Sequence, residues 1–454
     1  MALLSSRNYL RARLGVATVF GLVVLFAAAG NAQTWIQLQP GNPLPPPVYG
    51  SAGAYNPTTG RFIDFGGSAN PPSGLLPDGI FWNAVWVLAN ANGNGTPAWI
   101  QAVVENAPGS PGRRYGPSSA YDPATNRMII YAGQPEYLST FFTDVWLLRD
   151  ADGSATAPSW VQINPTGYAP PPRRDHRAVY DPASNRMIVF GGQGQGPSLQ
   201  FLNDVWILTN ANGTGDTPPS WIQLSPSGAA PLPRSQFVIG YDSAGNRLIV
   251  YGGLNSTGAL SDTWVLANAN GLADTPVWQQ LSLGPGPNQS AGAGSGQASS
   301  VGGYDPASNQ LATLSYDNSA VWILKNANGL GGAPTWQQLV PAGNPPTPRF
   351  GMAGAYDAIR GNLLVFGGQV SGGYALNDTF SLTNATGTRQ AAPVVNQRLR
   401  SSVRFRHPEI PAGARTHPAG DQPAEPRDGR DFHSCVERHA GSALAGIAGL
   451  RNPQ

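Results

Sequence analysis

The sequence predicts an all-β protein, built as a closed ring of six four-stranded antiparallel units. A Tyr-Asp-Pro-like motif recurs about every 60 residues, which is typical of repeat architectures, at Tyr55, Tyr121, Tyr180, Tyr241, Tyr304 and Tyr356. Gly (57 residues) and Pro (43 residues) are abundant and only 11% of residues are charged, as in turn-rich β structure. Twelve Trp and a hydrophobic content of 41% argue against disorder for most of the chain.

Each unit carries four strand signals in the same order. An apolar segment ending in Tyr leads into an Asp-Pro turn, as at Asp181-Pro182. The second strand ends in Gly-Gly, as in RMIVFGG at 186–192, and the paired glycines predict a bulge or a close backbone approach. The third strand resembles NDVWIL at 203–208, and after an Asn-Ala-Asn-Gly loop the fourth opens with Trp, as in WIQL at 221–224.

The composition of the strands predicts their order from the centre outward. They are nearly continuous apolar runs, which indicates burial on both faces. The fourth strand is the most polar, with Gln at its centre, and is expected at the outer edge.

These features resemble the kelch family over residues 35–387. The resemblance rests on Gly-Gly after the second strand, Asn-Asp-x-Trp in the third and Trp at the start of the fourth. It implies a six-bladed kelch-type β-propeller of the kind seen in the central domain of galactose oxidase, in a secreted bacterial setting. Unit 5 departs from the pattern, with LSYDNSAVW at 314–322, and unit 1 lacks the Arg that precedes the first strand elsewhere.

The repeat count predicts how the ring closes. A Trp segment, TWIQL at 34–38, precedes the first unit, whereas no Trp segment follows the last third strand at 377–382. The N-terminal segment is therefore expected to supply the fourth strand of the last blade.

Three regions are expected along the chain. Residues 1–32 have a basic start, an apolar run at 14–29 and small residues at 30–32, which predicts a signal peptide and a secreted or periplasmic protein. The alternative is an uncleaved membrane anchor. Residues 33–387 form the propeller. Residues 388–454, rich in Arg, Pro, Ala and Gly, are expected to be disordered; a docking segment, a metal-binding tract or a shifted reading frame are the alternatives.

Charge and cysteine content restrict the partners. Residues 33–387 carry 14 basic and 19 acidic residues, which gives no electrostatic case for binding nucleic acid. The single cysteine, Cys435, cannot form an internal disulfide. We expect no cofactor, no metal, no membrane association after signal cleavage, and a monomer that binds a protein or glycan ligand.

Strand alternation sorts the loops onto two faces. The strand 1–2 turns and strand 3–4 loops emerge on one side, here called the turn face. The strand 2–3 loops and the links to the next blade emerge on the other, here called the variable face because its loops differ in length and content. Rigid scaffolds carry function on variable loops, so a ligand is expected there.

Two sets of candidate ligand-binding residues fall on the variable face. The arginines are Arg113, Arg114, Arg173, Arg174, Arg234 and Arg349. They could receive an anionic group such as a uronic acid or sulfate, or they could hold the ring together by hydrogen-bonding carbonyls between blades. The aromatic residues are Trp82, Tyr137, Phe142 and Tyr374. They could stack on sugars or clasp a peptide, or pack within their loops.

Catalytic residues are scarce, so the sequence favours a binding function. The propeller contains one histidine, His176, and lacks the two His and the Cys that copper radical oxidases require. Turn formation explains the Asp-Ala-Asp-Gly loop at 150–153 better than calcium binding does. We expect a secreted binding or scaffold protein for a glycan or protein. A hydrolase or lyase of acidic polysaccharide, using the arginines and His176, is the alternative, and protein assembly at the cell envelope is a third possibility.

Overall fold

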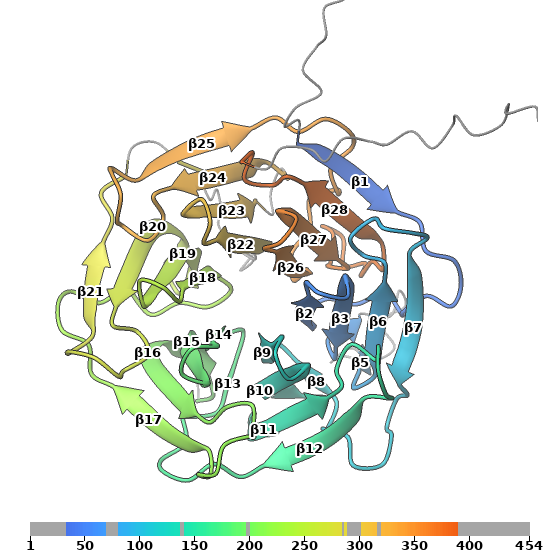
Figure 1. Cartoon of the computed structure of the whole chain (residues 1–454), viewed down its shortest axis with the longest axis horizontal. Coiled ribbons are helices and arrows are strands. Elements are labelled where there is room, and N and C mark those ends of the chain that lie inside the picture. The colour runs from blue at the N-terminus through green and yellow to red at the C-terminus, as the bar shows by residue number, and fades with distance from the viewer. Residues whose placement is uncertain are drawn as a thin grey trace, which may run out of the picture. The chain divides into compact units, whose positions relative to one another are not determined.

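Six antiparallel sheets are arranged as blades in a ring in the computed structural model of the chain, as Figure 1 shows. The structure describes residues 33–69, 80–136, 140–196, 200–283, 286–287, 301–315 and 319–388. The predicted signal peptide and the predicted tail beyond Thr388 lie outside these ranges. Within them the regular elements are all strands, and no apolar helix is present that could cross a membrane. The predicted six-bladed propeller is confirmed, and blades 1 to 6 are numbered by their Tyr motifs.

Four strands build each blade from the centre of the ring outward. The first strands are β2 (Ala52–Asn56), β9 (Ser118–Asp122), β14 (Arg177–Asp181), β18 (Val238–Asp242), β22 (Val301–Asp305) and β26 (Ala353–Asp357). The second strands are β3 (Arg61–Phe65), β10 (Arg127–Pro135), β15 (Arg186–Gly194), β19 (Arg247–Asn255), β23 (Gln310–Leu314) and β27 (Asn362–Phe366).

The outer half of each blade has the predicted order as well. The third strands are β6 (Val85–Ala89), β11 (Phe142–Arg149), β16 (Gln200–Thr209), β20 (Gly258–Ala267), β24 (Val321–Lys325) and β28 (Thr379–Thr383). The fourth strands are β7 (Ala98–Val103), β12 (Ser159–Ile163), β17 (Ser220–Leu224), β21 (Val277–Gln280), β25 (Thr335–Leu339) and β1 (Thr34–Leu38). Four two-residue strands complete the set: β4 (Ser68–Ala69), β5 (Ile80–Phe81), β8 (Arg114–Tyr115) and β13 (Arg173–Arg174).

The N-terminal strand closes the ring, as the repeat count predicts. β1 pairs antiparallel with β28, placing Trp35 opposite Leu382, and the Trp35 ring meets Phe380 edge-on with centroids 6.4 Å apart. The other edge of β1 is also occupied, because the Trp35 amide donates to the Ala342 carbonyl at 2.8 Å. Blade 6 therefore takes strands from both ends of the propeller.

The hydrophobic core is divided among the spaces between neighbouring blades. One cluster joins Ile63 and Phe65 of blade 1 to Met128 and Ile130 of blade 2, and the other five clusters also span adjacent blades. The second strands are buried on both faces because each one contacts two neighbours. This explains their unbroken apolar sequences.

The paired glycines produce the predicted bulges. The β15–β16 register shifts between Phe190 and Gly192, and equivalent shifts occur in blades 2 and 4. Gly192 has a φ of 103°, and a Cβ there would lie 2.7 Å from the Cβ of His176. A side chain fits neither the backbone conformation nor the space.

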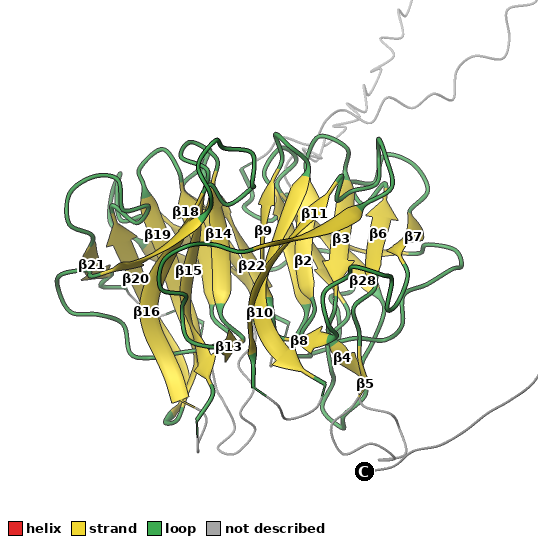
Figure 2. Ribbon diagram, turned by 90° about the horizontal axis from the view of Figure 1, so that it is seen from below, coloured by secondary structure: helices red, strands yellow, loops and turns green. Residues whose placement is uncertain are grey.

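The two faces differ as strand alternation predicts. Figure 2 shows the strand 1–2 turns and strand 3–4 loops along its upper edge, which is the turn face. The β15–β16 hairpin, β8 and β13 reach toward the opposite edge, which is the variable face.

Candidate functional site

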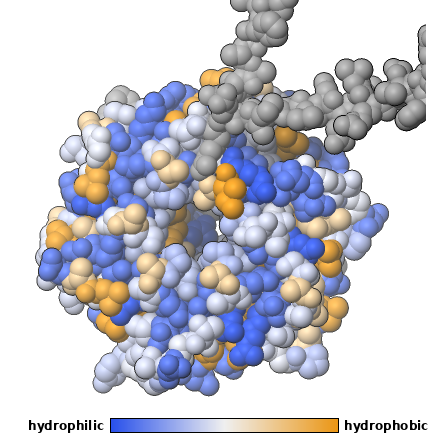
Figure 3. All heavy atoms as spheres, viewed as in Figure 1, coloured by the Kyte–Doolittle hydropathy of each residue, from blue (hydrophilic) through white to orange (hydrophobic). Residues whose placement is uncertain are grey.

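The six first strands enclose a cavity in the central channel. Its volume is about 130 Å³, and it is lined mostly by Gly, Ala, Ser and Val residues from all six blades. The channel opens at the centre of the surface shown in Figure 3. Because the first strands have no partner on their inner edge, alternate backbone amides and carbonyls face this space.

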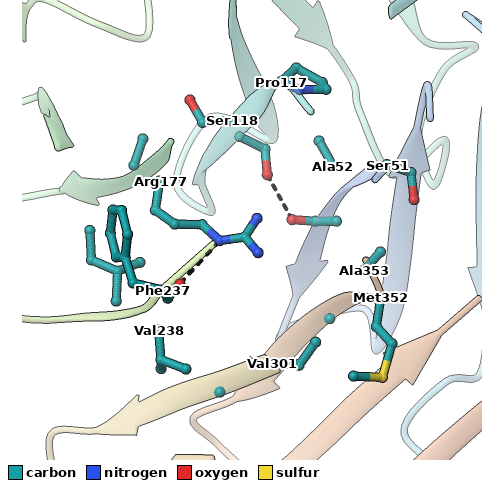
Figure 4. A pocket seen from close by; sticks show the side chains of 16 residues that line it. Ser51, Ala52, Pro117, Ser118, Arg177, Phe237, Val238, Val301, Met352 and Ala353 are labelled. Atoms are coloured by element: carbon teal, nitrogen blue, oxygen red, sulfur yellow. Dashed lines mark hydrogen bonds between the residues drawn. The ribbon is translucent and has the colours of Figure 1, made fainter. Parts of the chain in front are cut away.

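Arg177 is the only charged residue lining this cavity, among the residues that the structure describes. It opens β14, and its side chain extends into the open space in Figure 4. Nε donates to the Phe237 carbonyl at 3.3 Å. Burial lowers the pKa of the guanidinium, while the nearby Asp175 carboxylate raises it. An arginine guanidinium nevertheless stays protonated in proteins.

A series of backbone hydrogen bonds, here called the backbone arc, lies beside the channel toward the variable face. The Gln236 amide donates to Asp175 O at 3.0 Å, Asp175 to Gly116 O at 2.8 Å, Gly116 to Gly50 O at 2.9 Å, and Gly50 to Gly351 O at 2.7 Å. All five residues adopt φ between 53° and 67°. This conformation suits glycine but costs a residue such as Gln236 about 1 kcal/mol or more. The backbone arc ties five consecutive blades together at one level.

Aromatic and cationic side chains surround this mouth. The Tyr49 ring lies 5.4 Å from Tyr115 and 6.0 Å from Phe350, both edge-on. The Arg174 guanidinium lies 5.5 Å from the Tyr115 ring and 5.7 Å from Phe141. The cavity at this level has a volume of only about 10 Å³, which suffices for about one water molecule.

Charges at the mouth affect one another. Asp175 lies 3.6 Å from the Nε of Arg174. Burial raises the pKa of the Asp175 carboxyl, while Arg174 and Arg177 oppose the rise. The pKa of the Tyr115 hydroxyl is raised well above 10, first by burial and then by Asp175. Tyr115 is therefore a neutral hydroxyl at physiological pH.

Four of the six predicted arginines have a structural role. They lie seven residues before the Tyr of their blades and form buried ion pairs: Arg114–Asp144, Arg173–Asp204, Arg234–Asp262 and Arg349–Asp378. Arg234 is typical. Its Nε donates to Leu232 O at 2.9 Å, Nη1 to Gly252 O at 2.9 Å, and the two Nη atoms bind both Asp262 oxygens at 2.7 and 2.9 Å. These bonds fasten the link of a blade to its own second and third strands, rather than joining neighbouring blades.

The other two predicted arginines are partly exposed. Arg113 bonds to Glu105 at 2.7 Å and to Glu136 at 3.4 Å. Arg174 hydrogen-bonds to Gln193 at 3.0 Å and also to Gln134. The structure thus does not gather the six arginines into one ring. Arg174 alone lies beside the channel mouth among aromatic side chains.

His176 is placed where it cannot reach a ligand on the surface. Its side chain is fully buried, and its ring packs edge-on against Tyr131 at 5.2 Å. Neither ring nitrogen has a hydrogen-bond partner among the described residues. Burial, followed by the charges of Arg173 and Arg177, holds the pKa of His176 well below 6.5. The residue is neutral and packs in the core.

The predicted aromatic residues are dispersed. Phe142 lies over the buried guanidinium of Arg114 at 4.2 Å. Trp82 is half-buried and lines a small cavity beside Asp64 and Trp86 in blade 1. Tyr374 is 57% exposed in the β27–β28 loop. Tyr137 lies outside the described residues.

On the turn face, polar side chains are used to join neighbouring blades. Asn212 donates to Asp122 at 2.8 Å, Asn270 to Asp181 at 3.0 Å and Asn328 to Asp242 at 2.8 Å. Asp152, in the loop weighed for calcium, accepts hydrogen bonds from Asn56 and Asn126. The described residues contain no group of three or more His, Cys, Asp or Glu that could hold a metal ion. The Asn-Ala-Asn-Gly loops therefore have a structural explanation.

The fold and its motifs agree with comparisons to known proteins. Residues 152–329 match the family described as the KLHDC2/KLHL20/DRC7 Kelch-repeats domain. These residues are kelch repeats. Kelch-repeat propellers generally mediate protein interactions.

Curated relatives share part of their length with this chain. Putative adagio-like protein 2 of Oryza sativa subsp. japonica is 29% identical over 57% of this chain and 39% of its own length. Dynein regulatory complex subunit 7 of Chlamydomonas reinhardtii is 32% identical over 28% of this chain and 10% of its own. The solved structure of YjhT aligns with a TM-score of 0.48 at 14% identity, covering 74% of this chain and 95% of that one. The chain thus spans less than half of each curated relative named here.

Arg177 and the backbone arc are the features that sequence reasoning missed. The candidate arginines are those in the links just before the first strands, whereas Arg177 lies within a first strand, three residues before Tyr180. The signal was present in the repeat alignment, because the corresponding residues of the other blades are uncharged: Ala52, Ser118, Val238, Val301 and Ala353.

Proposed function

We propose that this chain is an exported binding protein that engages a protein or glycan partner through the variable face of its kelch propeller. One contrast carries this proposal. The polar side chains of the turn face are used in bonds between blades, while the variable face presents aromatic and cationic side chains around the channel mouth.

Arg174 is the centre of the proposed binding surface. It is partly exposed and lies beside Tyr115 and Phe141. A guanidinium beside aromatic rings suits a carboxylate-bearing sugar or an acidic peptide, since it offers charge, planar hydrogen bonds and a stacking surface. Tyr374, 57% exposed on blade 6, adds a further aromatic side chain to the variable face.

The binding proposal can be tested on the full chain with two panels. One is a set of immobilised acidic and neutral oligosaccharides, and the other is a displayed random-peptide library. For any selected binder, Arg174→Ala and Tyr374→Ala should weaken affinity at least about tenfold, the loss of roughly one contact of 1.4 kcal/mol. Leu272→Ala is the matched control, because Leu272 is 59% exposed in a turn-face loop. Binders weakened only by Leu272→Ala would place the binding site on the turn face and contradict the proposal.

Export rests on residues 1–32 and has a separate test. Mass spectrometry of the mature protein should find an N-terminus at Gln33, and cell fractionation should find the protein outside the cytosol. An intact N-terminus in the cytosolic fraction would contradict export and leave the binding proposal unaffected.

A hydrolase or lyase activity has no comparable support. His176, its candidate acid–base residue, is fully buried and neutral. General acid–base catalysis requires a group within hydrogen-bond reach of the substrate.

A further inference from the structure

We propose that the central channel contains a binding site for a small oxyanion, held by the guanidinium of Arg177. This site is distinct from the partner-binding surface proposed above, and neither proposal depends on the other. The ligand class is a tetrahedral or planar oxyanion of the size of sulfate, phosphate or a carboxylate group.

The guanidinium of Arg177 has free donors. Nε binds the Phe237 carbonyl, whereas neither Nη group has a hydrogen-bond or ion-pair partner among the described residues. This differs from Arg234, whose Nη groups are satisfied by Asp262 and Gly252. An anion with two oxygens would satisfy both Nη groups at once by bidentate hydrogen bonding.

The fold gives no reason for an arginine at this position. The corresponding residues in blades 1, 2, 4, 5 and 6 are Ala, Ser or Val, and they build the same strand in the same place. Arg177 therefore contributes a charge that the architecture does not require. In Figure 4 its side chain reaches into the space framed by Ser118, Val301 and Phe237.

Neutral donors around the cavity add to the site. Ser118 is only 3% exposed, lines the same cavity, and its hydroxyl has no hydrogen-bond partner among the described residues. The inner edges of the first strands add backbone amides. Carbonyls alternate with these amides, and one of them, Gly53 O, already accepts a 2.8 Å hydrogen bond from the Ser119 hydroxyl. Amides and hydroxyls around a cation form a suitable environment for an anion.

The local charge balance favours an anion even though the propeller carries more acidic than basic residues. Asp175 is the carboxylate closest along the chain, and its nearest cationic atom is the Nε of Arg174 at 3.6 Å. Two guanidinium groups and one carboxylate leave a net positive charge at this end of the channel. Low-dielectric walls concentrate that field inside the cavity.

The size of the cavity and its openings limit the ligand. A volume of about 130 Å³ exceeds that of one oxyanion group, whereas the neighbouring space toward the variable face has a volume of only about 10 Å³. The opening visible in Figure 3 lies on the turn face and supplies the route of entry. A bulky polymer is excluded from the interior, although a terminal acidic group of a sugar could enter.

Equilibrium dialysis of the full chain with radiolabelled sulfate, at constant ionic strength in sodium chloride, tests the site directly. The wild type should bind about one sulfate per chain in a saturable manner. Arg177→Gln should weaken binding more than tenfold, and Arg149→Gln, at an exposed position on β11, should leave it unchanged. Competition experiments with phosphate, acetate and glucuronate show whether the Arg177 site prefers a free anion or an acidic group carried on a sugar.

Folding of the variants is checked by far-UV circular dichroism and thermal melting. If Arg177→Gln fails to fold, Arg177→Lys keeps the charge, removes the bidentate geometry, and should bind sulfate several-fold more weakly than wild type. Absence of saturable sulfate binding by the wild type would overturn the proposal. Sulfate binding as tight as that of the wild type, by folded Arg177→Gln or by Arg177→Lys where that variant is tested instead, would also overturn it.

Discussion

The side-chain amide of Asn56 donates a 2.8 Å hydrogen bond to the Asp152 carboxylate, across the junction between blades 1 and 2. At the next three junctions the acid lies on the turn and the amide on the loop, in the pairs Asp122–Asn212, Asp181–Asn270 and Asp242–Asn328. The first junction exchanges the two residue types. Each of these junctions therefore combines one carboxylate with one amide.

This exchange predicts a rescue experiment. Asn56→Asp places two carboxylates together and should lower the free energy of unfolding by about 1–3 kcal/mol, because a buried acceptor loses its donor. Adding Asp152→Asn recreates the arrangement of the other junctions and should recover most of that loss. Urea unfolding of the two single variants and the double variant measures the coupling. Additive effects would show that the pair does not act as a unit.

Closure of the ring by Trp35 predicts a large packing loss on truncation. Trp35 is 4% exposed against Phe380, so Trp35→Ala should destabilise the propeller by about 3–5 kcal/mol. Ile36, on the same strand, is 46% exposed, and Ile36→Ala should cost less than about 1 kcal/mol. Similar effects of the two variants in chemical unfolding would argue against closure by this strand.

The buried ion pair of blade 4 predicts an asymmetry between single and double replacements. Arg234→Met leaves Asp262 without its partner and should cost about 3–5 kcal/mol. Blade 1 has Val48 and Ala84 at the corresponding positions. Arg234→Val combined with Asp262→Ala copies that arrangement and should be more stable than Arg234→Met. A double variant at least as unstable as the single would contradict the comparison.

His176 predicts a loss of stability in mild acid. Its pKa is held well below 6.5 in the fold, so below about pH 6.5 the unfolded chain binds a proton that the folded chain does not. The free energy of unfolding should fall as pH decreases, with a slope of up to about 1.4 kcal/mol per pH unit from this residue. His176→Leu should reduce the slope between pH 6.5 and 5 in denaturant titrations. An unchanged slope would mean that other groups dominate.

Asp64 predicts the opposite dependence. Burial raises its pKa from 3.8 to about 7, and the Ser51 hydroxyl partly opposes this. The folded chain keeps a proton that the unfolded chain releases above about pH 4, so stability contributed by the protonated form is lost as pH rises toward 7. Asp64→Asn should be more stable than wild type at pH 8 by more than about 1 kcal/mol, and the difference should shrink at pH 5. A constant difference across that range would exclude titration of Asp64 as the cause.

The sequence predicts the architecture well, because each blade repeats the same local signals. Gly-Gly, the Asp-Pro turn and the opening Trp are each determined by neighbouring residues, and the unpaired Trp segment at 34–38 follows from counting them. The role of Arg234 depends on Asp262, which lies 28 residues further along the chain. Its signal was nevertheless present, since units 2, 3, 4 and 6 carry both the Arg and the Asp, while unit 1 carries neither. Arg177 can be recognised only by aligning the six first strands, because it is the one charged residue at a position that is uncharged in the other five.

The pairing of β1 with β28 imposes an order on biosynthesis. Thr34 leaves the ribosome about 350 residues before its partner Thr383, which is on the order of half a minute at ordinary elongation rates. Throughout that interval the first outer strand has nothing to pair with, and the nascent ring stays open. A truncated translation product that stops short of β28 would expose two strand edges that could recruit each other between molecules. Completion of the last repeat is therefore the step that converts an aggregation-prone chain into a sealed one.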